Sequence, residues 1–384
     1  DVYKRQVQVM DTIPKSLLRW AVCAAVLAPS AVFLAVAEPE ALLSLALRLA
    51  PVLLFVAGMS VTVNLASAAG AFEAVARGLE RWTRSPWALW SGIVAIAAAS
   101  TIFLSLDTTA IMITPMAVAL ARRNGLKVVP VAFAVVWIAN LGSLLLPVSN
   151  LTNLLAAGPA HIASETAYMR MAAAPAAAAL LVAVAASWLT YVLAADEPAP
   201  SPRTEDEAAS SPALRVALAV LAVIPPALLV LPYWLVSTVA AAVLYAAAEK
   251  NHRRSNLVPW FSIVLAATFS CASAAAIAAG IEFGELDPVP LAAAGAVAAN
   301  AVNNLPAYLL LEPSAQTPQQ IMALLIGVNC GPIVTPWASL ATLLWHDQLQ
   351  RAGVAVAWKD VAVRGACLAP FAVAVPLGAM MVAG

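Results

Sequence analysis

Stretches of about 20 apolar residues recur along the whole chain, and this feature excludes a water-soluble fold. A helix of that length crosses the hydrocarbon core of a bilayer. Of the 384 residues, 63% are hydrophobic and 10% are charged, whereas soluble domains have about 45–50% and about 25%. The 20 basic residues balance the 20 acidic ones, so no net charge favours nucleic acid as a partner. We predict an all-α polytopic membrane protein whose surroundings are the lipid bilayer.

Nine apolar stretches are predicted to cross the bilayer completely. They lie near residues 17–37, 42–66, 128–156, 171–194, 213–231, 233–248, 257–279, 320–345 and 361–383. Two further apolar stretches, 86–121 and 289–311, carry polar residues at their middle, Asp107-Thr108-Thr109 and Asn303-Asn304 respectively. Each is predicted to be a re-entrant hairpin, because a polar tip is tolerated at membrane depth only where other helices bury it.

The positions of Lys and Arg test this arrangement, because basic residues gather at the cytoplasmic ends of membrane helices. With a cytoplasmic N-terminus and nine crossings, every Lys and Arg except Arg48 and Arg170 falls on the cytoplasmic side. Counting either hairpin as a full crossing would invert all later segments and destroy this separation. We therefore predict a cytoplasmic N-terminus and a C-terminus on the outer side.

A hydrophilic stretch rich in proline and acidic residues divides the chain near its middle. Four parts are predicted: an N-terminal tail (1–16), a first membrane half with a hairpin opening to the cytoplasm (17–194), a cytoplasmic linker (195–212) and a second membrane half with an outward-opening hairpin (213–384). Residues 71–84 combine apolar positions at helical spacing with three arginines. This pattern predicts a helix on the inner membrane surface, and a solvated loop is the alternative.

The two halves share a pattern of residues without a gap. In the first half it is Asn140-x-Gly142-x4-Pro147-x3-Leu151-x2-Leu154-Leu155, and in the second it is Asn329-x-Gly331-x4-Pro336-x3-Leu340-x2-Leu343-Leu344. A hairpin tip lies upstream of each copy. Because the two hairpins are predicted to open to opposite sides, the pattern indicates inverted-topology repeats, an architecture of secondary transporters.

Glycine and proline interrupt the apolar helix in each copy of this pattern. An unwound helix bares backbone N–H and C=O groups, and exposing them to lipid is costly, so they must face a ligand, water or side chains. Short hydroxyl and amide side chains crowd around both breaks and supply donors and acceptors without charge. The residues predicted to bind substrate or a coupling ion are Asp107, Thr108, Thr109, Asn140, Ser149, Asn150, Thr152, Asn153, Asn303, Asn304, Asn329, Thr335, Ser339 and Thr342.

Asp107 is the one carboxylate that the sequence places deep in the membrane. Intramembrane acids commonly carry protons or bind cations. An Asp in front of Thr-Thr-Ala-Ile-Met is also a good N-cap for the second arm of the hairpin, and capping alone would account for it. Both interpretations are open. The Asn-rich tip of the second hairpin likewise has a ligand-binding interpretation and a purely interhelical hydrogen-bonding one.

Three segments resemble the ArsB-type arsenite efflux permeases of the ion transporter superfamily: DTTAIMITPMAVAL (107–120), LPVSNLTNLLAAG (146–158) and GPIVTPWASLATLLWHDQL (331–349). The resemblance implies that residues 107–109 and 303–304 are hairpin tips, and that residues 149–153 and 339–342 flank the substrate. It also implies that arsenite or antimonite leaves the bacterial cytoplasm through the inner membrane, as the neutral hydroxide or its anion. Export would be driven by exchange with protons or assisted by a partner ATPase.

We therefore expect a secondary transporter of arsenite, antimonite or a related small oxyanion, with protons as the coupling ion and Asp107 as their carrier. The alternatives are a sodium/proton antiporter, or a dicarboxylate or sulfate carrier of the same superfamily. An enzyme is not expected, because no pair of His, Glu or Cys residues at membrane depth supplies a nucleophile with its base or a set of metal ligands. No cofactor or metal is expected, and the sequence leaves open whether the chain forms a homodimer or works with an ATPase.

Overall fold

The computed structural model of the protein describes residues 15–83, 85–158, 162–195, 211–249, 257–281 and 284–383. Every regular element within these ranges is a helix. Six of these helices are long and apolar enough to cross a membrane, so the predicted all-α polytopic class is confirmed. Most of the predicted tail (1–16) and of the predicted linker (195–212) lies outside the described residues.

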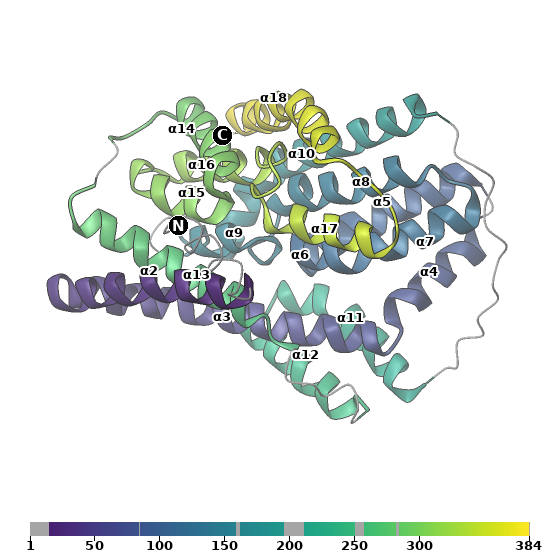
Figure 1. The fold of residues 1–384 in the computed structure, drawn as a ribbon, viewed down its shortest axis with the longest axis horizontal. Helices are drawn as coiled ribbons and strands as arrows, with labels where there is room; N and C mark the ends of the chain where they lie inside the picture. Colours follow the sequence, from purple (N-terminus) through teal and green to yellow (C-terminus); the bar gives the residue numbers. More distant parts are fainter. Residues whose placement is uncertain are drawn as a thin grey trace, which may run out of the picture.

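One group of helices forms a layer along the lower side of the molecule in Figure 1. Within it, α3 packs along α12, and α2 packs along α13. We call this group the α3 layer. Its members are α2 (Lys15–Ala37), α3 (Pro39–Ala68), α11 (Pro212–Leu228), α12 (Tyr233–Ala247) and α13 (Trp260–Ala278).

The other helices form a bundle above the α3 layer in Figure 1, which we call the core bundle. Residues 130–141 of α8 and 320–330 of α16 are buried without exception and make its centre. Long helices α10 and α18 pack against each other beside them. The first half contributes α5 (Pro86–Phe103), α6 (Leu106–Thr108), the π-helical turn η1 (Thr109–Ile113), α7 (Thr114–Asn124), α8 (Val128–Leu141), the 3-10 turns η2 (Gly142–Leu144) and η3 (Pro147–Ser149), α9 (Leu151–Ala156) and α10 (Glu165–Leu193). The second half contributes α14 (Pro288–Val302), α15 (Asn304–Leu311), the 3-10 turn η6 (Glu312–Ser314), α16 (Pro318–Cys330), α17 (Leu340–Arg351) and α18 (Trp358–Ala383).

A short helix, α4 (Ala71–Trp82), connects the α3 layer to the core bundle. It starts after Gly70, whose φ of 81° makes the turn away from α3. Ala71, Phe72 and Ala76 are buried, whereas Glu73 is exposed. The helix predicted within residues 71–84 is thus confirmed over Ala71–Trp82, in preference to a loop. Its position on the membrane surface stays a prediction.

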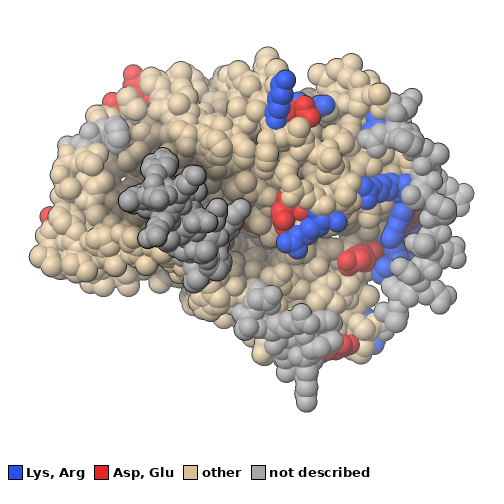
Figure 2. Space-filling model, in the orientation of Figure 1, with Lys and Arg blue, Asp and Glu red and all other residues tan. Residues whose placement is uncertain are grey.

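Charged side chains are sparse and unevenly distributed. Figure 2 shows a face made mostly of uncharged residues, in which the visible Lys and Arg lie over the right-hand part and none lies at the left edge. Helices α4 and α7 lie on the right in Figure 1. One-sided basic charge is what the predicted topology requires, and the assignment of that side to the cytoplasm stays a prediction.

Each half contains a helical hairpin with the same unusual backbone at its tip. Ser105 between α5 and α6 has a φ of 121°, and Asn303 between α14 and α15 has a φ of 103°. No other non-glycine residue of the described ranges has a positive φ. Their ψ angles are 161° and 153°, a region that glycine alone tolerates well and that marks functional sites when other residues occupy it. The two hairpins thus share one strained tip geometry, while the opposite orientation of the halves in a bilayer stays a prediction.

Two glycines allow the second interrupted helix to be held closely from both sides. A Cβ atom on Gly327 of α16 would lie 2.2 Å from the carbonyl oxygen of Ala292 in α14. A Cβ atom on Gly365 of α18 would lie 1.9 Å from the carbonyl oxygen of Ile333, in the segment between α16 and α17. Small residues permit this backbone approach in membrane helices, so α14 and α18 fix the position of the break.

Candidate substrate site

The first interrupted helix unwinds between α8 and α9, and protein groups satisfy the carbonyls that the break exposes. Asn153 Nδ2 donates to the carbonyl oxygens of Ser143 at 2.6 Å and Leu146 at 3.1 Å. The Tyr168 hydroxyl donates to the Leu144 carbonyl at 2.8 Å. Because buried backbone groups need partners, these side chains make the break a stable feature of the fold.

Asn329 from the second half joins this first break. Its Oδ1 accepts hydrogen bonds from Asn150 Nδ2 at 2.9 Å and from the Thr152 hydroxyl at 2.7 Å. Its Nδ2 donates to Asn153 Oδ1 at 2.7 Å. All four side chains are buried. These amides and this hydroxyl are therefore engaged with one another, and they connect the two halves at the centre of the core bundle.

The second interrupted helix is satisfied in a different way, by the hairpin of its own half. Asn300 of α14 accepts from the backbone N–H groups of Val334 and Thr335 at 3.1 and 3.2 Å, and it donates to the Gly331 carbonyl at 2.8 Å. The Thr335 hydroxyl returns a hydrogen bond of 2.7 Å to the Asn300 carbonyl. One amide thus takes the place of the helical hydrogen bonds that the break removes.

The tip of the second hairpin completes this contact. Asn303 Nδ2 donates to the Trp337 carbonyl at 2.8 Å, and the backbone N–H of Asn304 donates to the Ala338 carbonyl at 2.9 Å. The Trp337 indole donates to the Asn300 carbonyl at 3.0 Å. The interhelical hydrogen-bonding interpretation of this Asn-rich tip therefore describes its contacts in the structure.

A different set of polar atoms is buried without a partner. Seven side-chain atoms of the described residues are in this state, and two of them belong to Trp90 of α5 and Ser270 of α13. The other five come from α6, α7, α8, α17 and the residue before α17, and α17 packs against α6, η1, α7 and α8. We call them the unpaired group: Asp107 Oδ1, Thr114 Oγ1, Asn140 Oδ1, Ser339 Oγ and Thr342 Oγ1. A buried polar atom without a partner is destabilising, so the presence of five such atoms on α17, at its start and on helices that contact it indicates a ligand site.

Asp107 does not cap the second arm of its hairpin. Ser105 is the N-cap of α6, and its side chain accepts from the backbone N–H of Thr108 at 3.3 Å. Asp107 lies inside the first turn, and its Oδ1 has no hydrogen-bond donor. The capping interpretation of Asp107 is therefore wrong. Ser and Asp are equally good N-caps, and the sequence alone does not show which of two residues so close together ends the tight turn.

The remaining predicted residues of the first hairpin are engaged within it. The Thr109 hydroxyl accepts from Thr101 and donates to Ser100, both at 2.9 Å, and the Thr108 hydroxyl donates to the Leu104 carbonyl at 3.3 Å. Ser149 donates to the Ile102 carbonyl at 2.8 Å and so ties the first break to this hairpin.

The fourteen predicted residues thus fall into two classes. Asp107, Asn140, Ser339 and Thr342 have unpaired atoms, whereas the others make hydrogen bonds within the protein. Sequence reasoning missed Thr114, although it lies in the motif that follows Asp107. Among the described residues, no group of three or more His, Cys, Asp or Glu is placed to hold a metal ion.

Comparison with known proteins identifies the family to which the chain belongs. Residues 10–342 match the family model described as citrate transporter. The chain belongs to the citrate transporter family. It is also 28% identical over 333 residues to the arsenical pump membrane protein of Escherichia coli, a match that covers 75% of this chain and 76% of that protein. The resemblance to arsenite permeases, predicted from three motifs, is confirmed.

Membership of the citrate transporter family makes this chain a multi-pass membrane carrier for anions. A carrier needs polar groups at membrane depth that are free to meet the substrate.

Proposed function

We propose that this transporter exports arsenite, antimonite or a related small oxyanion across the bacterial inner membrane in exchange for protons, with its N-terminus in the cytoplasm. The unpaired group is the observation that carries the proposal. It offers two acceptor oxygens, on Asp107 and Asn140, and three hydroxyls that both donate and accept. A small hydroxide such as arsenite presents O–H donors and oxygen acceptors in the same small volume and complements this set.

The charge of the group supports a neutral or weakly charged substrate. Its members include one carboxylate and no cationic side chain. A multiply charged anion such as citrate would lose its hydration there without an opposite charge, which is strongly unfavourable at membrane depth. The similarity to the arsenical pump membrane protein supports the same choice.

Asp107 is the residue that we propose to couple substrate movement to protons. Asp107 is half-buried, and its Oδ1 is buried without a partner. Such a carboxylate favours a proton or a bound cation, and in our proposal it exchanges one for the other as the site changes sides. A sodium/proton antiporter is the second candidate, because the same carboxylate and hydroxyl oxygens also suit a hard cation.

Transport into everted membrane vesicles distinguishes these substrates. Vesicles that contain the parent chain and vesicles without it are compared for uptake of labelled arsenite, with antimonite, citrate or sulfate in excess as competitors, and for sodium uptake in parallel. We expect arsenite uptake that antimonite inhibits and citrate and sulfate do not. Citrate or sulfate competition, or sodium uptake without arsenite uptake by inserted protein, would contradict the proposal.

A further inference from the structure

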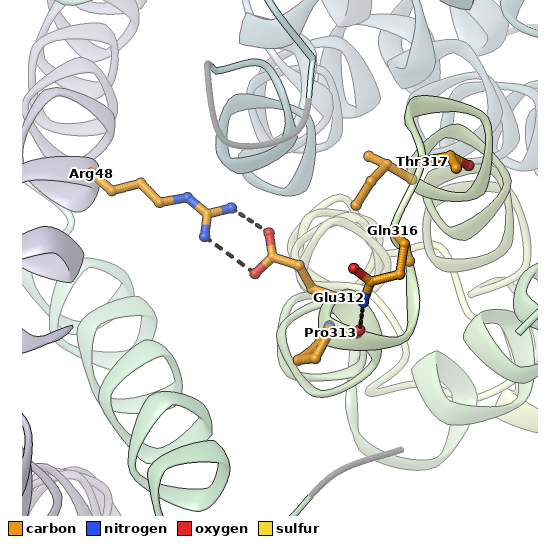
Figure 3. Close-up of a pocket in the computed structure, with 7 residues that line it drawn as sticks. Arg48, Glu312, Pro313, Gln316 and Thr317 are labelled. Atoms are coloured by element: carbon orange, nitrogen blue, oxygen red, sulfur yellow. Dashed lines mark hydrogen bonds and ion pairs between the residues drawn. The ribbon is translucent and has the colours of Figure 1, made fainter. Parts of the chain in front are cut away.

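An ion pair joins the α3 layer to the second hairpin of the core bundle. Arg48 of α3 contacts Glu312, the first residue of η6, through both guanidinium Nη atoms, with Nη1 at 3.2 Å from Oε2 and Nη2 paired with Oε1 (Figure 3). Arg48 Nη2 also donates to the Leu155 carbonyl at the end of α9, at 2.6 Å. The Tyr308 hydroxyl donates to Glu312 Oε1 at 2.7 Å. One arginine of the α3 layer thereby contacts both the first interrupted helix, at Leu155, and the end of the second hairpin, at Glu312.

The placement of this pair is unusual for the molecule. The other ion pair between described residues, Arg351 with Asp347, connects neighbouring turns of α17 and is largely exposed. Arg48 and Glu312 have side-chain exposures of 29% and 12%. Their attraction is therefore less screened than that of a surface pair.

A polar cavity lies beside the pair. It has a volume of about 390 Å³ and is lined by Arg48, Glu312, Gln316 and Thr317 together with Pro313, Ala315 and Ile321. Figure 3 shows the two charged side chains meeting across the space between α3 and η6. Separating two ions that lack such a cavity would leave both charges desolvated, which is strongly unfavourable. Here the cavity leaves room for water to solvate each charge when the pair separates, so the contact is suited to repeated opening and closing.

We infer that Arg48 and Glu312 form a latch between the α3 layer and the core bundle that opens and closes in each transport cycle. A carrier exposes its site alternately to the two sides by moving one helical group against another. Contacts between the two groups must break during that movement. This inference needs the chain to be a carrier, and it does not depend on which anion is carried.

A buried residue under the latch reports its opening. Ala315 lines the cavity and is buried, while its neighbour Gln316 is exposed. In a chain whose four cysteines are replaced by alanine, Ala315→Cys is expected to react slowly with a water-soluble maleimide supplied on both membrane faces. Gln316→Cys is the matched control, because its reactivity does not depend on the latch.

Neutralising either charge is expected to raise the labelling rate of Ala315→Cys by about fivefold and to leave Gln316→Cys unchanged. Arg48→Gln and Glu312→Gln together are expected to raise the rate by clearly less than the product of the two single effects, because both remove the shared ion pair. The exchanged pair, Arg48→Glu with Glu312→Arg, is expected to return towards the parent rate, and Arg351→Gln has no effect. Unchanged labelling in the single variants, or effects that multiply in the double variant, would overturn the latch.

A second measurement separates a latch from a fixed structural contact. Cysteines at positions 48 and 312 are joined by a reducible bifunctional thiol reagent, and arsenite and citrate uptake are measured before and after reduction. We expect cross-linking to stop uptake and reduction to restore it. Uptake at the parent rate by cross-linked protein would overturn the latch. If the parent carries neither anion, the proposed substrate fails, and the labelling experiment still decides the latch.

Discussion

Replacing Thr342 with valine is expected to stabilise the protein and to weaken transport. Thr342 is 2% exposed, and its Oγ1 is buried without a hydrogen-bond partner. Valine has nearly the same shape and a similar helix propensity. It removes an unsatisfied hydroxyl whose burial costs about 1–3 kcal/mol. At about 2.1 cal/mol/K of unfolding entropy per residue, the melting temperature of a 384-residue chain shifts by roughly 1 °C per kcal/mol. We therefore expect the melting temperature of the purified protein to rise by about 1–4 °C.

The same change removes one hydrogen bond to the substrate. A neutral hydrogen bond contributes about 0.5–1.5 kcal/mol, which corresponds to a KM for arsenite that is higher by about two- to twelvefold. Stability and transport therefore move in opposite directions, as expected at a site whose polar atoms serve a ligand.

Thr62→Val is the matched control for this prediction. Thr62 is also fully buried, but its hydroxyl donates to the Gly58 carbonyl of its own helix at 2.9 Å, in the α3 layer. We expect Thr62→Val to lower or preserve the melting temperature and to leave KM unchanged. If Thr342→Val behaves like Thr62→Val in both assays, the reasoning from unpaired atoms is refuted.

Three further predictions concern the parts that hold the site. Asn329→Ala removes three hydrogen bonds, to Asn150, Thr152 and Asn153. At about 0.6 kcal/mol or more for each bond in a membrane protein, we expect the free energy of unfolding to fall by about 2–4 kcal/mol and the melting temperature to fall with it. An unchanged melting temperature would show that the network is not formed. Ser105→Gly relieves a strained φ of 121°, which costs about 1–3 kcal/mol. The melting temperature should therefore be higher in Ser105→Gly than in the parent, and lower in Ser105→Ala. The reverse order would argue against strain. Gly327→Ala places a Cβ atom 2.2 Å from the Ala292 carbonyl oxygen of α14 and should lower the free energy of unfolding by about 1–3 kcal/mol. Equal yields and melting temperatures for Gly327→Ala and the parent would contradict this packing.

The membrane helices and hairpins could be predicted because lipid imposes strict rules on the sequence. Apolar length identifies crossings, and polar residues at the centre of residues 86–121 and 289–311 identify hairpins. The exact turn was missed because Ser105 and Asp107 are both good caps, and only the backbone geometry places the tip at Ser105. Local sequence signals thus predict which elements form more reliably than they predict the residue at which each element begins.

The sequence alone could not separate the predicted site residues that have unpaired atoms from those that make hydrogen bonds within the protein. Asn150, Thr152 and Asn153 have the same chemistry as Asn140 and Thr342, yet the first three pair with Asn329 from the other half. Which polar groups satisfy one another depends on tertiary contacts between distant segments. One signal was available: Arg48 is an exception to the predicted distribution of basic residues, and its partner Glu312 explains why it is tolerated there.

Proton-driven transport by the isolated chain tests the central claim most directly. Purified parent protein and Asp107→Asn are reconstituted in liposomes, a pH gradient is imposed, and arsenite uptake is followed together with the internal pH. We predict that the parent accumulates arsenite and dissipates the gradient, and that Asp107→Asn, folded and inserted to the same extent, does neither. Equal gradient-driven uptake by both proteins would contradict the role of Asp107, and the absence of arsenite uptake by the parent would contradict the proposed substrate.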